Sequence, residues 1–181
     1  VEVALELLPQ GVNKLVDLGT GTGAIALALA KEWPVAQVIG VDYQTEAVSL
    51  AGRNALRNGI GNASFCQSDW FSALADQAPF DLIVSNPPYI DPEDEHLSQG
   101  DVRFEPLSAL VAKEQGYADI SHIVEHARSY FTEHGYLYIE HGFEQGSAVQ
   151  SVLTDCGYEK VITYKDYSAN DRITCGCLTS Q

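Results

Sequence analysis

Short apolar runs alternate along this chain with longer stretches in which apolar side chains recur every three or four positions. The short runs predict buried strands, and the longer stretches predict amphipathic helices. The strands are expected at 14–18, 37–42, 63–67, 80–85 and 136–140. The helices are expected at 24–33, 46–57, 118–131 and 145–156. This alternation is typical of an α/β protein with a mostly parallel sheet and helices on both faces.

Two further strand-like runs, 160–164 and 172–177, are joined only by a short polar loop. A parallel crossover needs about a dozen residues or more, so these two strands are expected to pair antiparallel. Thr45 is expected to N-cap the helix that follows it, and Gly157 to end the helix before it. The 181 residues suffice for one domain with a sizeable core.

The first residues, 1–8, have the pattern of the tail of a helix. The chain opens on Val1 and contains no Met, so we expect it to be a domain cut from a longer protein. One long segment, 90–113, lacks periodicity and is acidic. A connection of that length predicts a lid or binding loop, although a solvated loop without a role is the alternative.

A glycine-rich loop, DLGTGTG at 17–23, follows the first strand and precedes the first long helix. Gly19, Gly21 and Gly23 allow a tight turn and a close approach of the backbone to a ligand. The spacing differs from the G-x-G-x-x-G of dinucleotide-binding proteins. Asp42 ends the second strand, where a carboxylate can accept both hydroxyls of a ribose. Loop and acid together predict an adenosine-type ligand.

Two more polar segments follow strands whose carboxyl ends meet at the same sheet edge. After the third strand, Asp69 could accept a hydrogen bond from an adenine amino group, and Trp70 could stack on the ring. The alternative is a capping aspartate and a core tryptophan. After the fourth strand comes N-P-P-Y at 86–89, where two prolines end the strand because neither can donate to a sheet ladder.

The composition excludes several classes of binding partner and site. The net charge of −15, from 25 acidic and 10 basic residues, argues against a nucleic-acid-binding face. No stretch approaches the ~18 apolar residues of a membrane helix, so no membrane association is expected. The four cysteines have no Cys/His cluster with metal spacing, so we predict no metal site and a reducing, cytoplasmic location.

These segments together resemble the class I S-adenosylmethionine-dependent methyltransferases. More narrowly, the chain is similar to the HemK-type glutamine methyltransferases, which modify peptide chain release factors. The likeness covers essentially the whole chain. It includes SNPPYI, GDVRFEPLSALVA at 100–112, EHG at 140–142 with QG soon after, and DRIT at 171–174. N-P-P-Y alone is shared with enzymes that methylate amino groups of nucleic acids, whereas RFEP is far more specific.

The resemblance implies a Rossmann-like seven-stranded sheet with an antiparallel last strand and S-adenosyl-L-methionine as the cofactor. It implies that residues 1–181 are the catalytic domain, without the N-terminal helical domain that helps engage the protein substrate. The implied cofactor-binding residues are Asp17, Gly19, Thr20, Gly21, Thr22, Gly23, Asp42, Asp69, Trp70 and Asn86. The implied substrate-binding residues are Asn86, Pro87, Pro88 and Tyr89, with catalytic roles for Asn86, Pro87 and Tyr89.

The implied reaction is methylation of the side-chain amide nitrogen of the GGQ glutamine in release factors. Such a nitrogen is a poor nucleophile, so the protein must supply positioning and charge stabilisation. We hypothesise that the Asn86 side-chain oxygen and the Pro87 carbonyl each accept one N–H of the amide, with Tyr89 packed on its plane. No histidine is assigned as a base, although His141 lies near the site edge.

Three alternatives remain open. A ribosomal-protein glutamine methyltransferase would have a closely similar sequence. A nucleic-acid methyltransferase acting on adenine or guanine amino groups could use the same N-P-P-Y geometry, but the acidic charge balance opposes it. A relative that binds the cofactor without turnover would not need Asn86.

Overall fold

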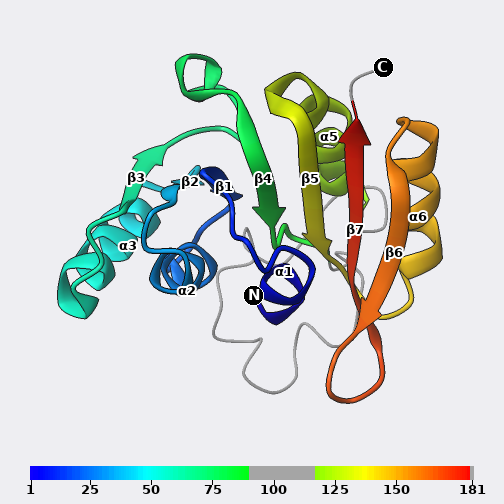
Figure 1. Cartoon of the computed structure of the whole chain (residues 1–181), viewed down its shortest axis with the longest axis horizontal. Helices are drawn as coiled ribbons and strands as arrows, with labels where there is room; N and C mark the ends of the chain where they lie inside the picture. The colour runs from blue at the N-terminus through cyan, green and yellow to red at the C-terminus, as the bar shows by residue number, and fades with distance from the viewer. Residues whose placement is uncertain (90–116, 180–181) are drawn as a thin grey trace.

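In the computed structural model, which describes residues 1–89 and 117–179, seven strands form one sheet (Figure 1). Its spatial order is β3-β2-β1-β4-β5-β7-β6. The strands are β1 (Lys14–Leu18), β2 (Gln37–Asp42), β3 (Ala63–Gln67), β4 (Phe80–Ser85), β5 (Phe131–Glu140), β6 (Glu159–Lys165) and β7 (Asp171–Thr179). β1 to β5 pair in parallel, and β7 pairs antiparallel with both β5 and β6. The predicted fold class is therefore confirmed.

Helices cover both faces of the sheet. They are α1 (Glu2–Leu7), α2 (Ala24–Glu32), α3 (Thr45–Asn58), α5 (Ala118–Ala127) and α6 (Gly146–Asp155), with 3-10 turns η1 (Ala75–Gln77) and η5 (Arg128–Tyr130). In Figure 1, α1, α2 and α3 lie in front of the sheet, and α5 and α6 lie behind it. The layers are those of a doubly wound α/β fold.

The alternation of side chains along the strands explains the two layers of core. Leu15 and Leu82 point to the face that buries Leu29 of α2. Their neighbours Val16 and Ile83 point to the opposite face. There they pack in a larger cluster with buried side chains of α5 and α6, namely Ile120, Ile123, Val124, Ala127, Val149 and Leu153. Because both faces are covered, the central strands read as continuous apolar runs.

The strand order reverses between β1 and β4. From β1 the chain builds outward through β2 to β3, and it then returns to place β4 on the other side of β1. In such sheets the helices on the two sides of this point diverge and leave a crevice at the carboxyl ends of the strands. In Figure 1 the arrowheads of β4 and β5 point to this edge, beside α1.

Two sequence predictions need correction. Thr45 is the first residue of α3 and not its N-cap, which is Gln44; the carboxylate of Asp42 accepts the Gln44 N–H at 2.9 Å. The helix predicted at 118–131 ends at Ala127, and Phe131 begins β5 by pairing with Phe80. Sheet pairing therefore takes over where the helical apolar periodicity still continues. The strand predicted at 136–140 therefore begins earlier than expected, at Phe131. The ends of the other elements agree within one or two residues.

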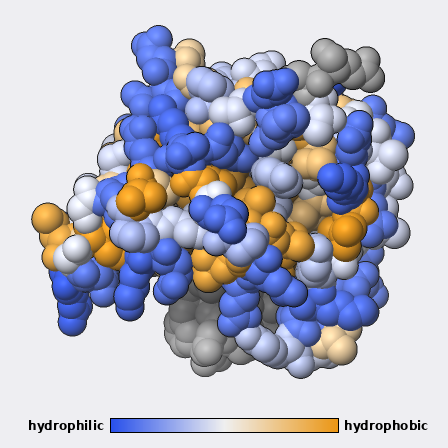
Figure 2. All heavy atoms as spheres, in the orientation of Figure 1, coloured by the Kyte–Doolittle hydropathy of each residue, from blue (hydrophilic) through white to orange (hydrophobic). Residues whose placement is uncertain are grey.

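The acidic loop predicted at 90–113, including the RFEP segment, lies outside the described residues. Among the residues that are described, no helix is long and apolar enough to cross a membrane. Figure 2 shows that apolar side chains gather across the middle of the face that carries α1, α2 and α3, between hydrophilic regions above and below.

Candidate active site

The sheet register brings three of the predicted segments together. Leu18, the last residue of β1, pairs with Val41 on one side and Ser85 on the other. The residues that follow these three are Gly19, Asp42 and Asn86. The glycine loop therefore starts between the acid that ends β2 and the asparagine that follows β4. This is the point at which the strand order reverses, where ligands bind in such sheets.

The glycine loop has the backbone shape that its glycines predict. Gly19, Gly21 and Gly23 have φ values of 71°, 54° and 81°, in the left-handed region that glycine favours. A side chain on Gly21 would meet nothing within 4 Å, whereas one on Gly23 would meet Ala51 of α3 at 3.0 Å. Gly21 thus borders open space, and Gly23 lets α2 pack closely against α3.

Asp17 holds this loop from below. It is 1% exposed, and its Oδ2 accepts the Thr20 hydroxyl at 2.7 Å and the Ala26 N–H at 3.2 Å. Its Oδ1 has no hydrogen-bond partner among the described residues. Burial raises the pKa of Asp17 to about 7, despite the two hydrogen bonds that favour the carboxylate. Asp17 and Thr20 therefore shape the loop, while Gly19 and Thr22 are its exposed residues.

Asp42 joins the glycine loop to the start of α3. Its Oδ2 accepts the Gly21 N–H at 2.9 Å, and its Oδ1 accepts the Gln44 N–H, also at 2.9 Å. The residue is only partly buried. Each carboxylate oxygen accepts more than one hydrogen bond, so Asp42 can hold the loop and still accept from a ligand hydroxyl.

The segment after β3 forms a compact turn at the same edge. The Ser68 hydroxyl donates to the Trp70 carbonyl at 2.8 Å and accepts the Ala73 N–H at 3.1 Å. Trp70 adopts a φ of 45°, and its ring would lie 3.8 Å from a Cβ placed on Gly19. The ring packs partly against the core, and the Asp69 side chain is exposed. The Trp70 ring thus lies both against the core and beside the glycine loop, so its position is compatible with packing and with stacking on a ligand.

The corner at 86–89 is tied to β1. The Ser85 hydroxyl donates to the Leu18 carbonyl at 2.8 Å, one residue before the glycine loop. Asn86 is exposed, Pro87 is buried, and Pro88 and Tyr89 are half-buried. An amide side chain therefore stands free at the edge, on a backbone that two prolines stiffen.

Sequence reasoning missed two residues at this edge. Glu140 ends β5 directly after Ile139, which pairs with Ser85, so it lies next to Asn86 in the register. Burial raises the pKa of its carboxyl group. Gln145 donates from its side chain to the Tyr89 carbonyl at 3.1 Å. The segments EHG and QG already stood out in the sequence, but nothing in them indicates a contact with the corner at 86–89.

His141 is fully buried, with both ring nitrogens engaged. Nδ1 lies 2.8 Å from the Gly142 carbonyl, and Nε2 lies 2.8 Å from the Thr174 hydroxyl. Burial lowers its pKa. Of the other histidines, His122 and His126 stack on one another on α5. With both nitrogens already hydrogen-bonded, the buried His141 ring is not available to take a proton from a ligand.

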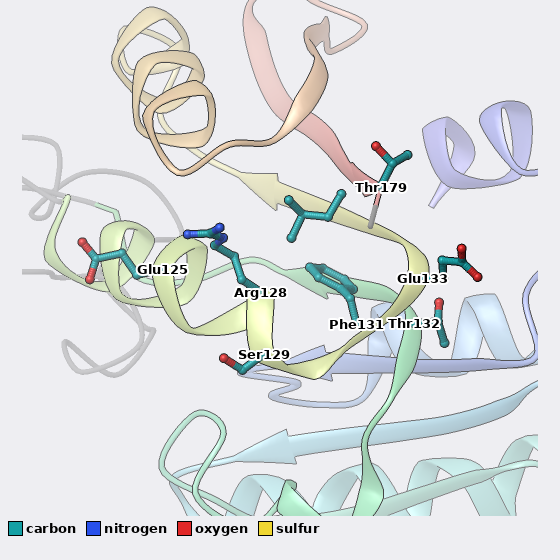
Figure 3. A pocket seen from close by; sticks show the side chains of 8 residues that line it. Glu125, Arg128, Ser129, Phe131, Thr132, Glu133 and Thr179 are labelled. Atoms are coloured by element: carbon teal, nitrogen blue, oxygen red, sulfur yellow. The ribbon is translucent and has the colours of Figure 1, made fainter. Parts of the chain in front are cut away.

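An open hollow at the opposite edge of the sheet is separate from this site. It is lined by Arg128, Phe131 and Thr179, among others, where β5 begins and β7 ends (Figure 3). None of the predicted site residues borders it. No three His, Cys, Asp or Glu side chains in the described ranges come close enough to hold a metal ion, and all four cysteines are free.

A doubly wound sheet with a glycine loop and an acid at its switch point has the architecture of the α/β enzymes that bind nucleotide-type ligands. The family model described as "Methyltransferase domain" matches residues 12–171. The chain belongs to this family of methyltransferase domains.

Curated relatives are similar over nearly the whole chain. The release factor glutamine methyltransferases of Vibrio cholerae and Escherichia coli are each 56% identical over 176 residues, or 97% of this chain. That of Salmonella typhimurium is 56% identical over 179 residues, or 99%. The chain spans 62 to 64% of the length of these relatives. The resemblance drawn from the sequence motifs is therefore confirmed.

Solved structures with low sequence identity share the fold. The ribosomal protein L11 methylase of Lactobacillus delbrueckii aligns with 99% of this chain and 77% of its own, with a TM-score of 0.70 and 16% identity. The 16S rRNA N2 G1207 methyltransferase of T. thermophilus, solved with AdoMet and guanosine, aligns with 98% of this chain and 41% of its own. Its TM-score is 0.70 and its identity 23%.

Proposed function

We propose that this chain is the catalytic domain of a protein methyltransferase that uses S-adenosyl-L-methionine to methylate the side-chain amide nitrogen of a glutamine in peptide chain release factors. The observation that carries the proposal is the register that sets the exposed Asn86 beside the glycine loop, with the Ser85 hydroxyl bonded to the Leu18 carbonyl. An acceptor group held at Asn86 would lie next to a cofactor held on that loop.

The described residues fit such a cofactor. Gly19 and Gly21 offer backbone beside open space, the Asp42 carboxylate keeps capacity to accept from hydroxyl groups, and the Trp70 ring lies beside Gly19. We assign the loop residues Gly19 to Gly23 to the methionine and ribose region and Asp42 to the ribose. Asp69 and Trp70 are assigned to the adenine, while Asp17 and Thr20 support the loop from below. When bound, the sulfonium supplies an activated methyl group.

Substitution of Asp42 by Ala tests the cofactor assignment. The variant loses a ribose acceptor and also frees the Gly21 N–H that anchors the loop. We expect its affinity for S-adenosylmethionine, measured by calorimetry, to fall by about tenfold or more, because one hydrogen bond to a charged group contributes about 1.5–3 kcal/mol. Asp76→Ala, at an exposed position in η1, is the control. Equal affinity in both variants would reject the role of Asp42.

The acceptor amide would be held at the corner 86–89. The Asn86 side-chain oxygen and the Pro87 carbonyl would each accept one of its N–H groups, which fixes the amide plane and stabilises positive charge as it develops on nitrogen. Tyr89 would pack against the flat amide. No general base is assigned. Attack of the amide nitrogen on the methyl group would give a positively charged nitrogen that carries the methyl group and both protons, and this cation is acidic enough to lose one proton to water. The His141 ring is buried, and both of its nitrogens are already hydrogen-bonded.

The identity of the acceptor rests on the relatives and on charge. The 56% identity to release factor glutamine methyltransferases extends over 97% of this chain. The net charge of −15 favours a protein acceptor over a nucleic acid. Work in the cytoplasm suits this acceptor and the four free cysteines. The further length of the relatives is consistent with a separate region that engages the protein substrate.

Methyl transfer from labelled S-adenosylmethionine tests the function. The acceptors are a release factor, the same factor with its GGQ glutamine replaced by alanine, a ribosomal protein, and an adenine- and guanine-containing RNA. We expect label in the intact release factor alone, using the protein at its full natural length. Label in the ribosomal protein would identify the nearest alternative, and label only in RNA would overturn the proposal.

A further inference from the structure

The side chain of Gln145 joins two loops at the carboxyl edge of the sheet. Its Oε1 accepts the Gly142 N–H at 2.8 Å, and its Nε2 donates to the Tyr89 carbonyl at 3.1 Å. The side chain is largely buried, with the residue 9% exposed, and the Gln145 backbone N–H donates to the Gly142 carbonyl at 2.9 Å. One residue thus connects the loop after β5 with the corner 86–89.

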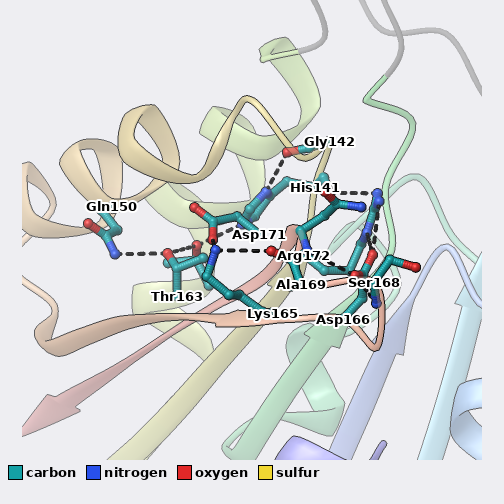
Figure 4. Close-up of polar contacts among 12 residues, drawn as sticks. His141, Gly142, Gln150, Thr163, Lys165, Asp166, Ser168, Ala169, Asp171 and Arg172 are labelled. Carbon is teal, nitrogen blue, oxygen red and sulfur yellow. Dashed lines mark hydrogen bonds and ion pairs between the residues drawn. The ribbon is translucent and has the colours of Figure 1, made fainter.

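A series of hydrogen bonds leads from Gln150 through Thr163 and His141 to the Gly142 carbonyl (Figure 4). The Gly142 carbonyl can only accept, so His141 Nδ1 carries the proton and donates to it. In the neutral ring Nε2 must then accept from the Thr174 hydroxyl. Thr174 in turn accepts from the Thr163 hydroxyl at 2.7 Å, and Thr163 accepts from Gln150 Nε2 at 2.8 Å.

In this series, each group donates to the next one, from Gln150 of α6 through Thr163 of β6 and Thr174 of β7 to His141 after β5. The network is partly buried, and its paired donors and acceptors restrict the side chains that form it. Arg172 of β7 adds a further bond to the carbonyl of His141 at 3.3 Å, and it pairs with Asp166 of the β6–β7 turn. The position of Gly142 is therefore restrained. Its N–H holds the Gln145 side chain, whose Nε2 bonds to the Tyr89 carbonyl.

The corner has a particular need for such a contact. The pairing of β4 with β1 ends at Ser85, and neither Pro87 nor Pro88 has a backbone N–H with which to extend it. Beyond the two prolines, a side chain from another part of the fold bonds to the backbone of the corner. The Gln145 amide does this at Tyr89.

We infer that Gln145 is a positioning residue for the proposed methyl transfer: it holds the corner 86–89 at the angle at which Asn86 and Pro87 receive the acceptor amide. The inference rests on the proposed function for its catalytic consequence. Gln145 does not itself touch the acceptor; it acts through the backbone of Tyr89.

Two substitutions separate positioning from general stability. Gln145→Leu removes both contacts. Gln145→Glu keeps an acceptor for the Gly142 N–H, but its ionised carboxylate cannot donate to the Tyr89 carbonyl. When protonated, the same carboxyl group regains one O–H donor. Among the described residues, the charged and titratable groups near this position include His141, directly after β5, and Asp171 and Arg172 of β7.

We expect kcat to fall roughly 10- to 100-fold in Gln145→Leu, the loss that a misplacement of about 1 Å can cause, with the dissociation constant for S-adenosylmethionine unchanged. In Gln145→Glu the ratio of kcat to that of the unsubstituted protein should rise as the pH falls, because protonation restores the donor. Gln145→Leu should have no such recovery. Gln77→Leu, in η1 at the opposite edge, is the matched control and should keep full activity.

Amide hydrogen exchange gives a readout that does not depend on turnover. The Gly142 amide should exchange faster in Gln145→Leu than in Gln145→Glu, which retains its acceptor. If the unsubstituted protein transfers no methyl group to glutamine, the proposed function fails. The exchange measurement still tests the hydrogen bond between the Gly142 N–H and Gln145. Unchanged kcat in both Gln145 variants, or a loss in Gln145→Glu that ignores pH, would overturn the inference.

Discussion

At the scale of single residues, the exposed amide of Asn86 is set apart from its buried surroundings. The residue before it donates its hydroxyl into the sheet, and the residue after it is a buried proline. A polar side chain that is solvent-exposed on a rigid support can bind a substrate without a large conformational cost. The exposure of Asn86 is consistent with the proposed contact to the substrate, and the side chain adds little to the buried packing of the fold.

Replacement of Asn86 by Ala tests this role. We expect turnover to fall by about 2–4 kcal/mol in barrier, the loss typical of one preorganised polar contact in a transition state. Cofactor affinity and the urea midpoint should stay close to those of the unsubstituted protein, because the side chain is exposed. Single-turnover methyl transfer and calorimetry measure the two effects. Normal turnover would exclude Asn86 from the mechanism.

Asp17 illustrates the opposite case of a polar residue that is buried for its contacts. Burial raises its pKa from 3.8 to about 7, so the folded state favours the protonated form over a range where the unfolded chain is ionised. The contribution of Asp17 to stability is highest at a pH below the pKa that it has in the unfolded chain. It declines as the pH rises, and it is constant above about pH 7.

Asp17→Asn removes this titration and keeps an oxygen that can accept from Thr20 and Ala26. From about pH 5 to about pH 8, the unfolding free energy of the unsubstituted protein should fall relative to the variant by about 2–3 kcal/mol. Urea unfolding at several pH values measures this difference, with the exposed Asp76→Asn as control. A difference that is independent of pH would mean that Asp17 is ionised in the folded protein throughout this range.

At the scale of elements, glycines in β2 and α3 have opposite roles. A Cβ on Gly40 of β2 would lie 2.5 Å from the Phe65 ring and 2.7 Å from the Thr20 hydroxyl oxygen. A Cβ on Gly52 of α3 would meet nothing within 4 Å. The first glycine lets the glycine loop and β3 pack closely on β2, whereas the second is a weak point in a helix.

The same substitution should therefore change stability in opposite directions. Gly40→Ala should destabilise by about 1–3 kcal/mol, the usual effect of overpacking, and weaken cofactor binding through Thr20. Gly52→Ala should stabilise by about 0.5–1 kcal/mol, because alanine has the higher helix propensity. Chemical denaturation of both variants measures the pair. Destabilisation by Gly52→Ala would indicate that this part of α3 contacts something outside the described residues.

Sequence periodicity predicted the elements wherever local pattern and tertiary pairing agree. The runs at 14–18, 37–42, 63–67 and 80–85 became β1 to β4 with the same ends. The periodicity gave the wrong element at Phe131, because the apolar side chain of this residue continues the pattern of α5 while its backbone pairs with Phe80 in the sheet. Pairing between residues so far apart leaves no local signature, so the start of β5 could not be predicted.

At the scale of the whole molecule, the site also combines features that the local sequence predicts with contacts between distant residues that it does not predict. Each loop of the crevice is recognisable from its own residues, and the parallel topology brings the loops to one edge. The contact from Gln145 to Tyr89 joins residues 56 apart in sequence and depends on how the turn after β5 folds back. Composition, in contrast, acts on the molecule as a whole and can be read directly from the sequence.

The net charge of −15 should make stability depend on salt. Like charges repel more strongly in the compact state than in the unfolded chain, and the screening length falls from about 30 Å at 0.01 M salt to about 10 Å at 0.1 M. The melting temperature should therefore rise with salt over this range, by about 2–4 °C for each kcal/mol of repulsion screened in a chain of this size.

Sodium chloride and sodium sulfate at equal ionic strength separate screening from ion-specific effects, because screening alone predicts the same rise in both. A melting temperature that falls with salt would mean that favourable ion pairs, such as Lys165 with Asp171 at 3.1 Å, outweigh the general repulsion. The same measurement bears on the acceptor. An acidic surface that salt stabilises also repels the phosphate backbone most at low salt, where nucleic-acid binding is normally strongest.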